Sequence, residues 1–458
     1  MELDRTIRRL RPRSRRIAPK LPRLRVPRTG MLAYLAAAGP GLITASAGND
    51  AGGIATYAQA GALYGYKLLW AMVVTAISLI VVQEMCSRMG AVTGKGLSDL
   101  IREEFGVRWA SLAMLGLLIA NGSITISEFV GMRAAAGVIA GEAALKGTAI
   151  GTQLPLVVVV LSAIGLWYLV TKGSRGPVER VLLVMTLVFF AYIPAAIVGQ
   201  HQQTGGWGLV LRATVTPTLG GARDVGLLAF MIALVGTTIS PYMQFFVQSS
   251  VVEEGATPAS YRYTRASVYV GSIFAIVIAM FIIIATAATL YGSPAVSANS
   301  GADQFAVALR PVLGAWAETL FAIGLFGASL LAAAVLPLST AFAVCETFGF
   351  ESGVDKSFQE APVFNGLFTG LIVVGALVAL AVPTQSLVPV LINLQAVNGI
   401  VLTMVVLFVV RLVNKKRLMG RYTNGPIYNI IAYASAALLA LLSALYLLGL
   451  FLHVGPAA

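Results

Sequence analysis

The residue with the clearest chemical potential is Asp50, a carboxylate inside a long apolar stretch. Asn49 precedes it, Gly52 and Gly53 follow it, and no Lys or Arg lies near it within the same stretch. A carboxylate at the bilayer centre costs roughly 2.5–3.5 kcal/mol on insertion scales, so it is retained for a partner or a function. Three roles are open: cation ligand, proton carrier and structural hydrogen-bond acceptor. A carboxylate beside free backbone carbonyls favours a hard cation that prefers oxygen ligands.

Two apolar stretches are interrupted at mid-depth by helix-breaking residues. Residues 39–53 contain Gly, Pro, Asn49 and Asp50, and residues 235–242 contain Gly236, Ser240 and Pro241. Such breaks at matching positions of two five-helix halves are typical of an inverted-repeat transporter with its binding site at the breaks. Unwound backbone at that depth must line a cavity or be buried in protein. Two packing kinks are the alternative, but kinks do not require Asp50.

The composition requires lipid as the solvent for much of the chain. Of 458 residues, 58% are hydrophobic and 11% are charged, whereas soluble domains carry about 25% charged residues. We therefore expect an all-α polytopic membrane protein with about eleven spans. The expected spans are residues 31–66, 67–88, 109–140, 154–171, 178–199, 224–250, 267–291, 316–349, 363–382, 386–410 and 426–451.

Basic residues predict the orientation. Residues 1–30 carry eleven Lys and Arg; if this tail is cytoplasmic, the remaining inner segments hold 15 basic residues and the outer loops hold five. Lys and Arg accumulate on the cytoplasmic side, so we expect a cell-membrane protein with its N-terminus inside and its C-terminus outside. The tail has no aromatic residue, and we interpret it as an anchor that touches anionic lipid rather than nucleic acid.

Other reactive residues form no recognisable site. Cys86 and Cys345 are far apart, and His201 and His453 form no cluster. The sequence contains no zinc-binding His pair, nucleophile elbow or phosphate loop that would indicate an integral-membrane enzyme. We expect no enzyme activity and no cofactor. The oligomeric state is open.

Several runs of residues resemble the Nramp family of divalent-metal transporters. The matching runs are residues 39–41, 50–56, 59–62, 65–66, 88–95, 128–131 and 418–420. The resemblance implies a LeuT-like 5+5 inverted repeat, with an eleventh helix and broken helices 1 and 6. It divides the chain into a basic tail (1–30), two five-helix repeats (31–199 and 224–413) and the eleventh helix (426–451).

The chain departs from the family pattern at the positions that bear the chemistry. The family's Asp-Pro-Gly-Asn motif reads Asp-Ala-Gly-Gly, so Gly53 replaces an amide ligand. The Met-Pro-His motif of helix 6 reads Ser240-Pro241-Tyr242, and the Asp of the helix 3 proton-path motif is Thr125. Losing a thioether favours Mg²⁺ over softer metals, and losing side chains predicts a roomier site for its waters. The pattern resembles the divergent Nramp-related magnesium transporters more than the manganese and iron carriers.

We therefore predict a divalent-cation carrier that works by alternating access, with Mg²⁺ as the main cargo, Mn²⁺ as a second one, and no proton coupling. The rivals are a proton-coupled Mn²⁺ or Fe²⁺ carrier, a sodium-coupled amino-acid carrier of the same fold, an integral-membrane enzyme, and a receptor or scaffold. The predicted metal-site residues are Asp50, Ser240, the backbone carbonyls near Ala47 and Thr237, and Gly53, which marks the missing ligand.

Five further residues are predicted to lie around that site or along the pathway: Asn49, Thr125, Glu128, Tyr242 and Asn398. Glu128 has three open interpretations, namely a remnant of the proton path, a vestibule acid and a partner of Arg133. Asn49 either holds an outer water or caps the first half-helix.

Overall fold

The computed structural model describes residues 50–141, 147–172, 187–201, 206–218, 225–294, 296–297, 301–354 and 356–451. These residues form helices and connecting segments with no strand. Nine stretches of the described helices are long and apolar enough to cross a bilayer. The expectation of an all-α membrane protein is confirmed. The tail at 1–30 and the first part of the first span lie outside the described residues.

The spans fall close to their predicted positions. Eight are continuous helices: α4 (Leu69–Thr93), α6 (Val107–Ala140), α7 (Ala149–Lys172), α13 (Tyr261–Leu290), α16 (Ala317–Phe348), α17 (Pro362–Ala381), α18 (Leu387–Val413) and α20 (Pro426–Phe451). Shorter pieces are α3 (Ala51–Tyr64), the pair η1 (Leu187–Ala191) and α9 (Tyr192–His201), and the pair α11 (Val225–Thr238) and α12 (Pro241–Glu253).

The predicted break in the sixth span is present between α11 and α12. Ile239 and Ser240 leave the helical path there, and Pro241 occupies the first position of α12. Proline suits a first helical position because its fixed φ is already helical and its missing N–H would have no partner. Gly236 is not part of the break, since α11 continues to Thr238. Its role is close packing: a Cβ there would lie 2.5 Å from the Gly399 nitrogen of α18.

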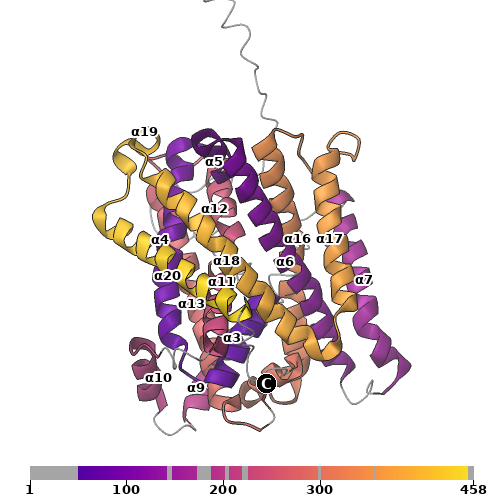
Figure 1. The fold of residues 1–458 in the computed structure, drawn as a ribbon. Coiled ribbons are helices and arrows are strands. Elements are labelled where there is room, and N and C mark those ends of the chain that lie inside the picture. The colour runs from indigo at the N-terminus through magenta and orange to yellow at the C-terminus, as the bar shows by residue number, and fades with distance from the viewer. Residues whose placement is uncertain are drawn as a thin grey trace, which may run out of the picture.

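The half-helices lie at the centre of the bundle. α3 packs against α13, α18, α11 and α6, and α11 packs most closely against α18. α6 and α16 form the most extensive helix pair, and α17 and α7 lie beside it at one edge of the molecule (Figure 1). Because the neighbours shield them, residues 51–62 of α3 are all buried.

Short helices lie at the two ends of the bundle, and three of them were not predicted from the sequence. α5 (Leu97–Phe105) and α19 (Lys416–Met419) lie at one end, and α10 (Gly206–Val215) lies at the other, beside α9 of the predicted span 178–199 (Figure 1). Lys415 and Arg417 both form ion pairs with Glu104 of α5, and these partners hold the pKa of Glu104 below its usual value. The remaining short elements are α14 (Ala302–Val307), α15 (Arg310–Leu313), η2 (Gly314–Trp316), η3 (Thr384–Ser386) and η4 (Gly420–Tyr422).

Candidate metal-binding site

Asp50 stands at the N-terminus of α3. Its backbone is extended (φ −71°, ψ 172°), and its Oδ1 accepts a 2.6 Å hydrogen bond from the Gly53 N–H. The residue is 2% exposed. This is N-cap geometry, in which a carboxylate satisfies a free N–H and lies at the positive end of the helix dipole. Because an ionised carboxylate has about four acceptor positions on its two oxygens, Asp50 keeps capacity for a cation while it caps the helix.

Thr237 brings a second oxygen to Asp50 from α11. A Cβ placed on Gly53 would lie 2.9 Å from Thr237 Oγ1 and 3.0 Å from Asp50 Oδ1, so both oxygens crowd the same glycine. Thr237 Oγ1 is buried without a hydrogen-bond partner. The sequence predicted the Thr237 carbonyl as the ligand, but the hydroxyl is the atom that faces the carboxylate. The expected extra room is also absent at Gly53, because Thr237 fills it.

Helix α18 adds two amides. Gln395 Nε2 donates to Asp50 Oδ1 over 3.5 Å, and Asn398 Nδ2 donates to Gln395 Oε1 over 2.8 Å. Asn398 Oδ1 has no partner. An amide carries both a donor and an acceptor, so if both amides turn over, the Gln395 nitrogen donates to Asn398 Oδ1 and the Gln395 oxygen faces Asp50. The two amides can therefore offer a donor to Asp50 when the site is empty and an acceptor oxygen when a cation is bound.

Aromatic residues close the site on two sides. Tyr57, one turn beyond Gly53 on α3, shares a 2.8 Å hydrogen bond with Thr238 Oγ1 and so joins α3 to α11. Tyr242 is 3% exposed and lies in the same buried region as Asp50 and Glu128. Asp50 is therefore closed off from solvent by protein in this conformation.

The Ser240 hydroxyl donates its hydrogen to the end of α11. Its Oγ donates to the carbonyls of Gly236 and Thr237, both at 3.2 Å. Met243, the methionine nearest to the break, directs its Sδ at Gln83 of α4, 3.8 Å away. The role of Ser240 as a cation ligand stays a prediction. The described residues contain no group of three or more His, Cys, Asp or Glu side chains that could hold a metal.

Glu128 and Thr125, one turn apart on α6, contact different neighbouring helices. Glu128 is fully buried, and its Oε2 accepts a 3.3 Å hydrogen bond from the Ala51 N–H. Thr125 Oγ1 donates to the Asn121 carbonyl at 2.7 Å, and its methyl group would lie 3.2 Å from a Cβ on Gly375 of α17. The structure therefore brings Glu128 to the start of α3 and leaves Thr125 facing α17.

Arg133 is occupied at the end of α17. Its Nη1 donates to the carbonyls of Ala379 (2.6 Å) and Val382, and Nη2 donates to Thr384 Oγ1 at 3.4 Å. These acceptors lie at and just beyond the C-terminus of α17, where carbonyls lack helical partners. Of the three interpretations of Glu128, a partnership with Arg133 is thus not realised.

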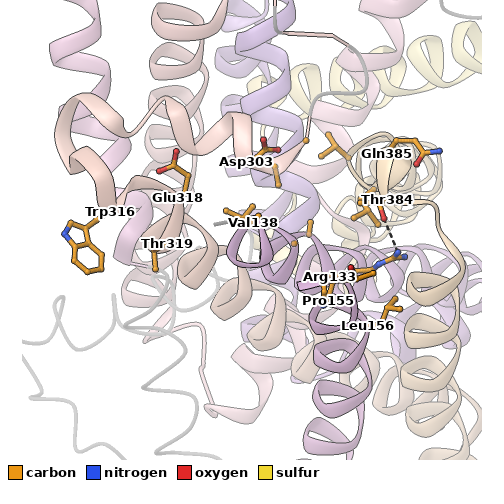
Figure 2. Close-up of a pocket in the computed structure, with 18 of the residues that line it drawn as sticks. Arg133, Val138, Pro155, Leu156, Asp303, Trp316, Glu318, Thr319, Thr384 and Gln385 are labelled. Atoms are coloured by element: carbon orange, nitrogen blue, oxygen red, sulfur yellow. Dashed lines mark hydrogen bonds between the residues drawn. The ribbon is translucent and has the colours of Figure 1, made fainter. Parts of the chain in front are cut away.

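Arg133 also lines a cavity of about 1080 Å³ between the ends of α6, α7 and α16. Figure 2 shows Asp303 and Glu318 on one wall and Arg133 with Thr384 on the other. Glu318 is paired with Arg310. Asp50, Thr237 and Gln395 are not among the residues that line the cavity, so it is separate from the Asp50 site.

Two predicted residues, Ala47 and Asn49, lie outside the described residues. Two residues that contact the site were not among the predicted ligands, Tyr57 and Gln395. The spacing of Gln395 and Asn398, three residues apart on a helix, could have indicated one polar face. Tyr57 carried no such signal, because a tyrosine in an apolar helix has many packing roles.

Comparison with known proteins identifies the family of this chain. The model of the Nramp family, described as natural resistance-associated macrophage protein-like, matches residues 41–449. The chain belongs to the Nramp family. The predicted family is therefore confirmed.

Curated relatives share this family. A "divalent metal cation transporter MntH" of Pectobacterium carotovorum subsp. carotovorum (strain PC1) is 27% identical over 408 residues, or 87% of this chain and 90% of the relative. A protein of the same name from Verminephrobacter eiseniae (strain EF01-2) is 29% identical over 326 residues, or 67% of this chain and 68% of the relative.

Solved structures show the same fold. A manganese transporter of Eremococcus coleocola, solved as a point mutant, aligns with a TM-score of 0.73 at 16% identity, covering 92% of this chain and 88% of that one. MhsT in complex with L-phenylalanine aligns with a TM-score of 0.56 at 17% identity, covering 88% and 98%. The predicted LeuT-like fold is thus confirmed. The exact repeat boundaries, 31–199 and 224–413, stay predictions.

Proposed function

We propose that this Nramp protein carries divalent metal cations across the cell membrane by alternating access, with Asp50 as the central ligand. The observation that supports this most strongly is the meeting of three polar groups at the start of α3. The Asp50 carboxylate, the unpaired hydroxyl of Thr237 and the Gln395 amide come from three different helices. Hard oxygen ligands suit hard divalent cations, and relatives of this chain are named divalent metal cation transporters.

We propose Mg²⁺ as the preferred ion, as in the magnesium branch that the sequence resembles, and Mn²⁺ as a secondary one. The sequence has Ser240 where the family has a thioether, and Met243 faces α4 rather than Asp50. Without a thioether, a site gains little for softer metals. Mg²⁺ keeps several waters and needs few protein ligands, which fits one carboxylate with neutral oxygens.

Transport without proton coupling is the second part of the proposal. Thr125 does not titrate and faces α17, and Tyr242 replaces the family's histidine. We also propose that the N-terminus is cytoplasmic and the C-terminus outside. An inside-negative membrane potential then drives uptake of a cation without a coupled proton. It contributes about 2.3 kcal/mol per elementary charge per 100 mV, and a divalent ion gains twice that.

The main alternative is a proton-coupled Mn²⁺ carrier. A solved structure with this fold is a manganese transporter, and Glu128 retains a buried carboxyl beside Ala51. An amino-acid carrier fits less well, because Asp50 would repel a substrate carboxylate. The named relatives are transporters, and we propose no enzyme activity.

Uptake into liposomes tests the function. Purified protein is reconstituted around an ion-sensitive dye, and Mg²⁺, Mn²⁺ or Ca²⁺ is added outside under an inside-negative potential. We expect protein-dependent uptake of Mg²⁺ and weaker uptake of Mn²⁺. Uptake of Mn²⁺ with no Mg²⁺ uptake would contradict the selectivity, and no divalent uptake by folded protein would contradict the function.

A further inference from the structure

Glu128 is a fully buried acid for which the described residues provide no counter-charge. None of their Lys, Arg or His side chains forms an ion pair with it, and Arg133 is bound at the end of α17. One carboxyl oxygen accepts a single 3.3 Å bond from Ala51, and the other, Oε1, has no partner. A buried carboxylate costs several kcal/mol when it is unpaired. The site therefore calls for a bound cation or a proton.

Two buried serines of α6 and α16 lie near the start of α3, and only one of them contacts this carboxyl. Ser329 of α16 lies beside the Glu128 carboxyl and interacts with it as a hydrogen-bond donor, and its Oγ has no other partner. Ser127 Oγ is unpaired and lies against the first turn of α3, 2.7 Å from the position of a Cβ on Gly52. Both serines are 0% exposed. Buried polar atoms are normally satisfied, so the unsatisfied Glu128 Oε1 and Ser127 Oγ indicate a missing ligand near the start of α3.

Close backbone packing brings α3, α6 and α16 together beside Glu128. Gly131, one turn after Glu128 on α6, lies so close to its neighbours that a Cβ there would be 2.7 Å from Ser329 Oγ and would overlap Ala51. α3, α6 and α16 are thus in direct contact at this level. We call Glu128, Ser329 and the neighbouring Ser127 the corner; all three are buried, and Glu128 and Ser127 lie against the first turn of α3.

We propose that Glu128 and Ser329, with Ser127 beside them, bind a hard monovalent cation, for which Na⁺ is the probe. The donors are a carboxylate and hydroxyls, with no sulfur or imidazole, so they suit a hard ion. One carboxylate neutralises one positive charge, whereas a divalent ion would leave an unbalanced charge in a region of low dielectric. The Na⁺ site is separate from the divalent site in its donors, although Ala51 adjoins both.

Occupation of the two sites is coupled through charge. Asp50 and Glu128 are held at the same turn of α3 and together carry two negative charges. A divalent ion at Asp50 neutralises both negative charges. When the carrier is empty, neither carboxylate is balanced unless another cation binds. Na⁺ therefore occupies the corner when the divalent ion is absent and leaves when it binds. This exclusion rests on the proposed function; the Na⁺ site itself does not.

Direct binding of ²²Na⁺ to the purified full chain tests the site without any transport. Binding is measured by scintillation proximity in detergent at pH 8, with choline chloride holding the ionic strength constant and no divalent ion present. We expect saturable binding that Mn²⁺ or Mg²⁺ displaces. Glu128→Gln should abolish it, and Ser329→Ala should weaken the affinity about tenfold, which corresponds to about 1.4 kcal/mol.

Ser123→Ala is the matched control. Ser123 lies one turn before Ser127 on α6, and its hydroxyl is satisfied by the Ile119 carbonyl at 2.8 Å, so this change should leave Na⁺ binding intact. If Glu128→Gln does not fold, Ser329→Ala against Ser123→Ala decides alone. No saturable ²²Na⁺ binding to folded wild-type protein would show that the counter-charge is a proton and overturn the proposal. Unchanged binding in Ser329→Ala would overturn it as well.

If ²²Na⁺ binds but divalent ions do not displace it, the exclusion is wrong and the proposed divalent site at Asp50 is in question, while the Na⁺ site stands. If ²²Na⁺ does not bind but divalent uptake proceeds, only the Na⁺ proposal fails.

Discussion

Adding one methyl group at Gly53 should impair transport while leaving the fold intact. In Gly53→Ala the new Cβ would lie 2.9 Å from Thr237 Oγ1 and 3.0 Å from Asp50 Oδ1, whereas ordinary contact begins near 3.4 Å. One or both oxygens must move by several tenths of an ångström. Alanine favours a helix over glycine by up to about 1 kcal/mol, so the loss cannot come from a weaker helix. We expect uptake to fall about tenfold, equivalent to about 1.4 kcal/mol.

A double-mutant cycle with Thr237→Ala locates the effect. Thr237→Ala removes the crowded hydroxyl, so adding Gly53→Ala to it should cost much less than in wild type, and the two changes should be strongly non-additive. Gly122→Ala is the control, because its Cβ would meet Leu371 at 3.6 Å, an ordinary contact. Rates of Mg²⁺ and Mn²⁺ uptake in liposomes are the readout. Wild-type uptake by Gly53→Ala, or full additivity with Thr237→Ala, would refute the placement of Gly53 beside the ion.

The crowding at Gly53 also affects the test of ion selectivity. Gly53→Asn with Ser240→Met restores both family side chains and should shift the preference from Mg²⁺ toward Mn²⁺. Because Thr237 Oγ1 fills the space at Gly53, we expect the shift to be larger when Thr237→Ala is added. An unchanged ion ranking in a triple mutant that folds and transports would place selectivity elsewhere.

Three further results are expected. Mg²⁺ uptake should not acidify the liposome lumen, since Thr125 and Tyr242 replace titratable family residues, and a trapped pH dye that reports metal-dependent acidification would contradict this. Gln395→Ala should lower divalent uptake about tenfold, equivalent to about 1.4 kcal/mol, and an uptake equal to wild type would remove this amide from the site. Arg133→Gln should lower the melting temperature without changing the KM for the ion, because its guanidinium satisfies carbonyls at the end of α17; a changed KM at an unchanged melting temperature would show a pathway role.

The spans could be predicted from sequence because each needs about 20 apolar residues to cross the bilayer. The predicted segment 363–382 differs by one residue at each end from Pro362–Ala381. Short helices between the spans, such as Leu97–Phe105, were not predicted because they are too short to give a hydrophobic run.

The site could be predicted only where the sequence itself is unusual. Asp50 was evident because a carboxylate in an apolar stretch is costly. The spacing of Gln395 and Asn398 indicates a polar face on α18. The approach of that face and of Tyr57 to the site depends on the packing of α18 and α11 on α3, which spacing within one helix does not encode. The prediction for Ser240 was made from its identity alone, and the structure shows its hydroxyl bonded to the carbonyls of Gly236 and Thr237.

Divalent uptake by Asp50→Asn tests the role of Asp50 most directly. Asparagine caps a helix about as well as aspartate, so it keeps the hydrogen bond from Gly53 and removes only the charge. We predict a loss of Mg²⁺ and Mn²⁺ uptake of at least about a hundredfold, equivalent to about 2.7 kcal/mol, with a melting temperature close to that of wild type. Uptake at the wild-type rate by this variant would show that the Asp50 carboxylate does not bind the ion.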